Sequence, residues 1–173
     1  MRVRSAFLLA AIAAPALGAQ GVRINFEAYR EPVLMDTLRQ NYVIKAAPAK
    51  VYEAALKAFA DLDIPVGNTV GTEGVIGSER FHRMHSLAGD LLSKSFDCGD
   101  DPTGPSANSQ RVEIAVVAYV APAPSGESGT RLGVSVIAQG REVAGPYRAP
   151  RPCASTGALE RKLRNKIQQL SGA

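Results

Sequence analysis

The sequence predicts an α+β domain with two layers, in which an antiparallel sheet is packed by two helices. Residues 46–66 and 157–170 place apolar side chains at helical spacing, so each forms an apolar stripe. Residues 111–120 and 130–138 alternate apolar and other positions, as half-buried strands do. An apolar stripe on a helix must pack on another apolar surface, and the alternating strands supply it.

The first helix is the clearest local element. Pro48 suits the first turn, where its missing N–H is not needed, and Pro65 stops any continuation. The side chains that recur every three or four residues, and therefore share one face, are Val51, Tyr52, Ala55, Leu56, Phe59 and Leu62.

Strands are expected on both sides of this helix. Residues 41–45 are rich in β-formers and precede it, while residues 64–70 follow it. A turn at 71–74 leads into a third strand over 75–85, whose charged residues suggest one face in water. Gly71 and Gly74 belong to that turn and open no helix that could hold a phosphate.

The two alternating segments predict an antiparallel hairpin, joined by the residues around 122–129. One face of the hairpin carries its apolar side chains: Val112, Ile114, Val116, Ala118, Val120, Leu132, Val134, Val136 and Ala138.

Less regular segments fill the rest of the domain, which is expected to span residues 40–173. Residues 86–98 suit either a short helix or a bent strand. Residues 99–109 and 140–152 are rich in Gly or Pro and predict loops. The closing helix repeats Leu159, Leu163, Ile167 and Leu170.

The N-terminus resembles an export signal over residues 1–19. Arg2 and Arg4 precede a short apolar run, and a small-residue cleavage site follows at residues 16–18. The run is too short to span a bilayer, and no cysteine follows it to carry a lipid. No second long apolar run follows, so we expect a periplasmic or secreted protein without a membrane span. Residues 20–39 form either an edge strand or a mobile leader.

The net charge and the cysteine content indicate which partners and which compartment suit the protein. Removing residues 1–19 takes away two arginines and no acid, so the formal charge falls from +4 to +2. This weak excess does not favour nucleic-acid binding, which needs a clustered basic face. Cys98 and Cys153 are the two cysteines, and in an oxidising compartment they favour a disulfide over free thiols.

A resemblance covers residues 41–76. A strand, then Ala47 to Tyr52, a helix ending in Leu62 to Val66, and a hairpin at Gly74 to Ile76 resemble the opening of a helix-grip domain. It is most similar to the repeats of the BamC family, an outer-membrane assembly lipoprotein, and is also similar to START and polyketide-cyclase-like ligand pockets. The BamC family implies a helix-grip-like fold and no catalytic residues, although the paired cysteines here depart from it.

The segments around the two cysteines, 95–99 and 153–157, also resemble exported bacterial proteins of no assigned function.

Candidate metal and catalytic residues do not match a known pattern. His82 and His85 point to opposite faces of a strand, which disfavours a shared metal. Asp97, Asp100 and Asp101 do not have the spacing of an EF-hand loop, so a solvated acidic turn is favoured. No protease signature surrounds Cys98 beside the histidines. We therefore expect no cofactor, no metal and no enzyme activity.

One loop suggests a binding role. Arg141, Tyr147, Arg148 and Arg151 could contact an anionic lipid, glycan or protein, or could form a solvated loop. The expected function is that of an exported, non-catalytic protein-interaction or structural module of the cell envelope. The alternative is a carrier of a small apolar ligand or lipid between the sheet and the helices, where Ala55, Ala58 and Gly133 leave room.

Overall fold

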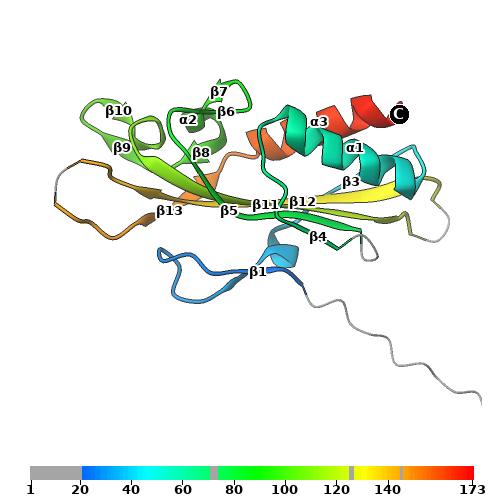
Figure 1. Ribbon diagram of the computed structural model, residues 1–173, viewed down its shortest axis with the longest axis horizontal. Coiled ribbons are helices and arrows are strands. Elements are labelled where there is room, and N and C mark those ends of the chain that lie inside the picture. The colour runs from blue at the N-terminus through cyan, green and yellow to red at the C-terminus, as the bar shows by residue number, and fades with distance from the viewer. Residues whose placement is uncertain (1–20, 71–73, 125–126, 145) are drawn as a thin grey trace, which may run out of the picture.

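An antiparallel sheet forms the middle of the molecule (Figure 1). Its central strands are β5 (Val75–Arg83), β11 (Arg111–Pro122) and β12 (Thr130–Arg141). β4 (Asn68–Val70) pairs with the outer side of β5, and β3 (Gln40–Ile44) pairs with the first half of β12. Together with the two main helices, this sheet confirms the predicted α+β class.

The structure is a computed structural model that describes residues 21–173, apart from 71–73, 125–126 and 145. The predicted signal segment, 1–19, lies outside the described residues, as does most of the predicted turn at 71–74. Within the described ranges, no helix is both long and apolar enough to cross a membrane.

The predicted hairpin is confirmed, because β11 and β12 pair along their whole length from Arg111 opposite Arg141 to Pro122 opposite Thr130. The predicted apolar face of the hairpin is buried in one cluster with both helices. In β5 an extra residue lies opposite β11, and this bulge makes Glu79 and Arg80 consecutive exposed residues.

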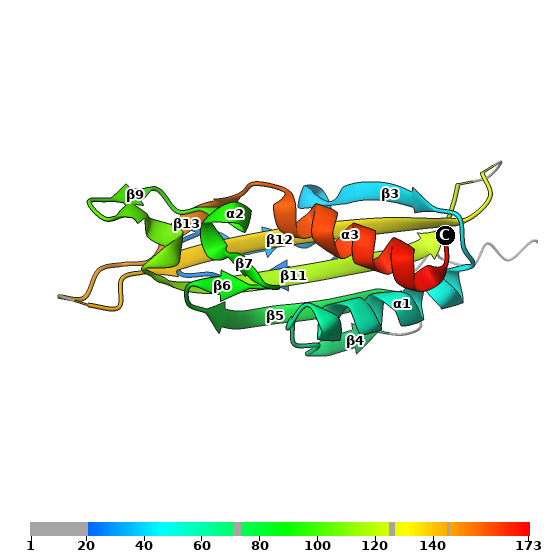
Figure 2. The ribbon, with the colours of Figure 1, turned by 90° about the horizontal axis from the view of Figure 1, so that it is seen from above.

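Helices α1 (Pro48–Asp61) and α3 (Ala158–Ser171) lie side by side over one face of the sheet (Figure 2). Pro48 begins α1, as predicted. The helix ends before Pro65 because Asp63 adopts a left-handed conformation with φ of 54°. Most of the predicted stripe residues are buried against the sheet: Val51, Ala55, Phe59, Leu62, Leu159, Leu163 and Ile167. Tyr52, Leu56 and Leu170 are only partly buried at its edge, and Ala54 and Ala58 are buried as well.

The opposite face of the sheet is covered by the N-terminal segment. It contains β1 (Arg23–Ile24), β2 (Val33–Leu34) and a 3-10 helix, η1 (Met35–Leu38). β1 pairs with β2 and not with the main sheet. Its apolar residues form a second cluster with alternate residues of β11 and β12: Ile24, Phe26, Met35, Ala115, Val117, Tyr119 and Ile137. The N-terminal segment is thus a partial third layer (Figure 1).

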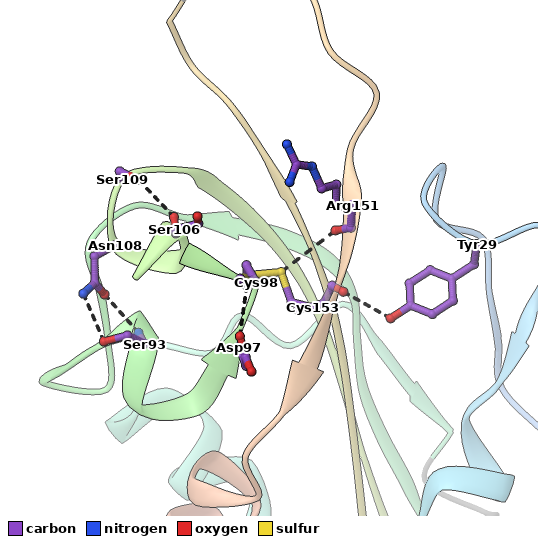
Figure 3. The surroundings of a disulfide bond; sticks show 11 residues. Tyr29, Ser93, Asp97, Cys98, Ser106, Asn108, Ser109, Arg151 and Cys153 are labelled. Carbon is purple, nitrogen blue, oxygen red and sulfur yellow. Dashed lines mark hydrogen bonds between the residues drawn. A yellow bond between two sulfur atoms is a disulfide. The ribbon is translucent and has the colours of Figure 1, made fainter. Parts of the chain in front are cut away.

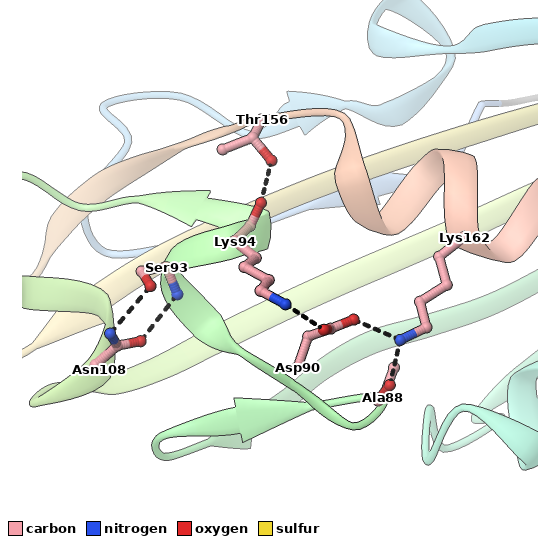
Figure 4. Close-up of polar contacts among 7 residues, drawn as sticks. All are labelled: Ala88, Asp90, Ser93, Lys94, Asn108, Thr156 and Lys162. Atoms are coloured by element: carbon pink, nitrogen blue, oxygen red, sulfur yellow. Dashed lines mark hydrogen bonds and ion pairs between the residues drawn. The ribbon is translucent and has the colours of Figure 1, made fainter.

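Residues 86–98, for which the sequence left a short helix or a bent strand open, contain both. The loop expected at 99–109 also contains short elements. The elements are β6 (Ser86–Leu87), β7 (Asp90–Leu91), α2 (Leu92–Ser95), β8 (Phe96–Asp97), β9 (Asp100–Asp101), β10 (Gly104–Pro105) and a 3-10 helix, η3 (Ser106–Asn108). Polar contacts join this region to α3 and its leading turn (Figure 4). Lys162 Nζ lies 2.5 Å from Asp90 Oδ2, and Thr156 Oγ1 donates to Lys94 O at 2.6 Å.

Several predicted boundaries are wrong. The strand expected over 75–85 ends at Arg83, and His85 beyond it has a left-handed conformation with φ of 64°. The strand expected at 64–70 is limited to β4, because residues 64–67 form the connection out of α1. The loop expected at 140–152 ends early, because β13 (Arg151–Ser155) pairs with β12 and then with β8. Pro152 is tolerated there because it pairs with β12 only, before the pairing with β8 begins at Ala154.

Candidate functional site

Polar side chains gather at one end of the sheet, on the face that the N-terminal segment covers. Arg111 of β11 lies directly opposite Arg141 of β12, and Glu113 lies opposite Gln139. On the other side of β11, Glu113 faces His82 of β5. These side chains share one face because alternate residues of a strand point the same way.

A small cavity of about 150 Å³ opens among these residues, lined by Arg111, Glu113, Gln139 and Arg141. The Gln139 amide donates to the Glu113 carboxylate. Arg111 Nη2 donates to His82 Nδ1 at 3.2 Å when the imidazole carries its proton on Nε2. Among the described residues, the walls of the cavity therefore carry two guanidinium groups and one carboxylate, that of Glu113.

The N-terminal segment passes beside the cavity. Its Ala28 N–H donates to Gln139 Oε1 at 2.8 Å, and the Tyr29 hydroxyl donates to Ala138 O at 3.2 Å. Glu27 forms an ion pair with Arg141, in which the two side chains are 58% and 37% exposed. The Ala28 N–H and the Tyr29 hydroxyl thus fix this stretch, while the Glu27 side chain remains open to solvent.

The loop at residues 142–150, hereafter the arm, extends from this end of the sheet (Figures 1 and 2). Its side chains Val143 and Tyr147 are 55% and 73% exposed, more than the other large apolar side chains in the described ranges. The Arg141 guanidinium lies 5.3 Å from the centre of the Tyr147 ring, which indicates a cation–π contact.

The arm region also carries uncompensated positive charge. Arg148 and Arg151 pair with a single carboxylate, that of Glu142, at 3.1 and 3.6 Å. The side chains of Arg148 and Arg151 are 60% and 61% exposed. The four residues predicted to meet an anionic partner therefore lie on the arm or at its two ends.

The predicted disulfide is present between Cys98 and Cys153 (Figure 3). Cys153 follows Arg151 by two residues in β13, and Cys98 directly follows β8. The bridge therefore attaches the end of the arm to the irregular region at residues 86–108. Both cysteines are buried, which protects the bridge from solvent.

The histidines and aspartates considered for chemistry do not form a common site. His82 contacts Arg111, whereas Asp97 accepts a hydrogen bond from Gly99 N at 2.9 Å. Asp101 accepts hydrogen bonds from Ser109 and Thr103, which lower the pKa of its carboxyl. Among the described residues, no group of three or more His, Cys, Asp or Glu side chains could hold a metal ion.

The interface between helices and sheet, where the carrier alternative places its ligand, is lined by buried apolar side chains. Ala55, Ala58 and Phe59 are fully buried there. Gly133 lies on the other face of the sheet, where a Cβ atom would meet the Arg39 side chain at 2.1 Å. The expectation that Gly133 opens space beneath the helices is therefore wrong, because its position in β12 places it opposite to Leu132 and Val134.

Comparisons with known proteins do not place the chain: no model of a protein family matches it, and no curated protein does so either.

Arg111, Glu113, Gln139 and Glu27 are site residues that sequence reasoning missed. Arg111 and Glu113 alternate with buried valine and isoleucine at the start of β11, so the hairpin register could have placed them beside Arg141 and Gln139. The contact of Glu27 with Arg141 joins residues far apart in the chain and has no local signal.

Proposed function

We propose that this chain is an exported protein of the cell envelope, periplasmic or secreted, that acts as a non-catalytic protein-interaction or structural module through its arm. The observation that carries the proposal is the exposure of Tyr147 and Val143 on a loop that extends from the domain. Aromatic and arginine side chains are the residues most enriched at the energetic centres of protein interfaces. The arm combines both types.

The arm is also suited to bind without a large loss of conformational entropy. Pro146 and Pro150 restrict its backbone, since each fixes φ near −65°. The disulfide holds its second end through Cys153, and the pairing of β12 holds its first end. A loop whose two ends are held loses less freedom when a partner orders it.

The charge of the arm favours an anionic partner surface. Arg148 and Arg151 share the single carboxylate of Glu142, so one positive charge remains. Complementary charge increases association rate and specificity more than affinity. We therefore assign the apolar contacts of Tyr147 to affinity and the arginines to partner choice.

Export is supported by two independent features. The first residues have the basic and apolar pattern of a signal peptide, and the buried disulfide suits an oxidising compartment. N-terminal sequencing of the protein from cell envelopes should find a chain that begins near residue 19, whereas an intact Met1 would contradict export by a cleaved signal.

A structural role is supported by the resemblance of residues 41–76 to BamC repeats, a family without catalytic residues. The carrier alternative requires a ligand between the helices and the sheet. Native mass spectrometry should then detect a retained apolar molecule; a protein purified without one contradicts the alternative.

Affinity purification from cross-linked envelopes tests the proposed module. Changing Val143 and Tyr147 together to serine should reduce recovery of a specific partner by about tenfold or more, as loss of an interface centre does. Val43→Ser is the matched control, because Val43 is also an exposed apolar side chain, at 52%, but pairs with Arg131 at the end of β12 that is far from the arm. Equal recovery by all three proteins, or no specific partner, would contradict the proposal.

A further inference from the structure

We propose that the cavity at the end of the sheet is a binding site for one carboxylate group, held between Arg111 and Arg141. Glu27 of the N-terminal segment occupies the Arg141 side of this site from within the chain. The inference does not require the arm to bind a protein, so the two proposals can fail separately.

The first observation is the juxtaposition of two like charges. Arg111 and Arg141 lie directly opposite each other on neighbouring antiparallel strands and line the same cavity. Like charges in that position destabilise a sheet unless an anion lies near them. The Arg111 guanidinium contacts the imidazole of His82 and, among the described residues, no carboxylate.

The second observation is the charge balance of the lining. Two guanidinium groups face one carboxylate, that of Glu113, which the Gln139 amide holds in place. One positive charge is left, and a single carboxylate neutralises it. A phosphate dianion would leave the site with an excess negative charge, so the charge of the lining favours a monoanion such as a carboxylate. Arginine also matches a carboxylate geometrically, because its planar donors can bind both oxygens.

The third observation is the present occupant. Glu27 supplies the neutralising carboxylate by pairing with Arg141. Its side chain is 58% exposed, and exposed ion pairs contribute little to stability. The neighbouring backbone is held independently by Ala28 and Tyr29, so only the Glu27 side chain has to swing away. An incoming carboxylate can therefore replace it without unfolding the segment.

Two sources could supply the carboxylate: a glutamate or aspartate side chain of a peptide, or a small free carboxylate. The two share the same chemistry at the arginines. The oxidised protein can be titrated with N-acetylglutamate amide and with acetate, while NMR follows the side-chain Nε–Hε signals of its arginines. Tighter binding of the first probe identifies a peptide side chain, and equal binding identifies a free carboxylate.

Three variants make the titration decisive. Glu27→Gln should raise affinity for the carboxylate probe about twofold to fivefold, because it removes a weak exposed competitor. Arg111→Ala should abolish the saturable shift of the Arg141 signal. Arg131→Ala is the matched control, since Arg131 is an exposed arginine at the other end of β12, and it should leave the titration unchanged.

Several outcomes of this titration would contradict the proposed carboxylate site. The proposal would be contradicted if the Arg141 Nε–Hε signal shifted without saturating. It would also be contradicted if the saturable shift persisted in Arg111→Ala. Tighter binding of inorganic phosphate than of either carboxylate would contradict the assigned ligand, and so would equal binding of the neutral N-acetylglutamine amide. No change in affinity on Glu27→Gln would contradict the role of Glu27 as internal occupant.

Discussion

Removing the disulfide should destabilise the domain by a predictable amount. The bridge joins residues 55 positions apart, and it closes a loop that is otherwise free in the unfolded chain. The loop-entropy relation gives about 4 kcal/mol at 25 °C for a loop of this length. The double variant Cys98→Ala with Cys153→Ala should therefore lose about that much free energy of unfolding, measured by urea denaturation.

The same experiment tests the physical origin of the effect. If the bridge acts by restricting the unfolded chain, its loss lets that chain expose more surface, and the dependence of unfolding free energy on urea should become steeper. Each single cysteine variant removes the same bridge and should match the double variant closely. A loss below about 1 kcal/mol, with an unchanged urea dependence, would refute the entropic reasoning.

Three further predictions concern the core, a turn and an acidic side chain. Phe59→Ala should lower the free energy of unfolding by about 3–5 kcal/mol in urea denaturation, because the ring is fully buried beneath α1. Gly74→Ala should lower it by more than about 1 kcal/mol, because Gly74 has a φ of +65° and a Cβ atom would lie 2.1 Å from Val120 O. The amines of Lys162 and Lys94 lower the pKa of Asp90 from 3.8 to about 2, so its stabilising contribution is present above pH 3.8 and is lost as pH falls through about 2. Asp90→Asn should flatten that part of an acid-unfolding profile; an unchanged profile would show that the lysine contacts do not bias folding.

Local patterns were sufficient for the main elements. The hairpin of β11 and β12 could be predicted because its alternation and connecting residues lie within one short stretch. Helix α1 could be predicted for the same reason, although its end depends on a left-handed residue, Asp63, that carries no strong sequence signal.

Elements that depend on distant partners could not be predicted. β13 contains Pro152 and shows no periodicity, so it forms only because β12, β8 and the disulfide provide its partners. The N-terminal layer does have a local signal in the strand that it covers. Residues 114–118 of β11 are apolar at every position, which is typical of a strand buried on both faces.

Some residues of the candidate site could be predicted from the local sequence, and others could not. Arg141 and Tyr147 could be selected from a single loop of unusual composition. Arg111 required the hairpin register, and Glu27 required knowledge of how the N-terminal segment crosses the sheet. Contacts between distant parts of the chain therefore determine which arginines lie together in a site.

The central claim is that the arm is the contact surface of an interaction module. Its most direct test places a photo-cross-linking amino acid at position 147 in the full chain, expressed in its native envelope, with position 57 on the exposed face of α1 as the control. Irradiation should produce one discrete adduct from position 147 that is absent from position 57 and weakened by Arg148→Ala. The same adducts from both positions, or none from position 147, would contradict the claim.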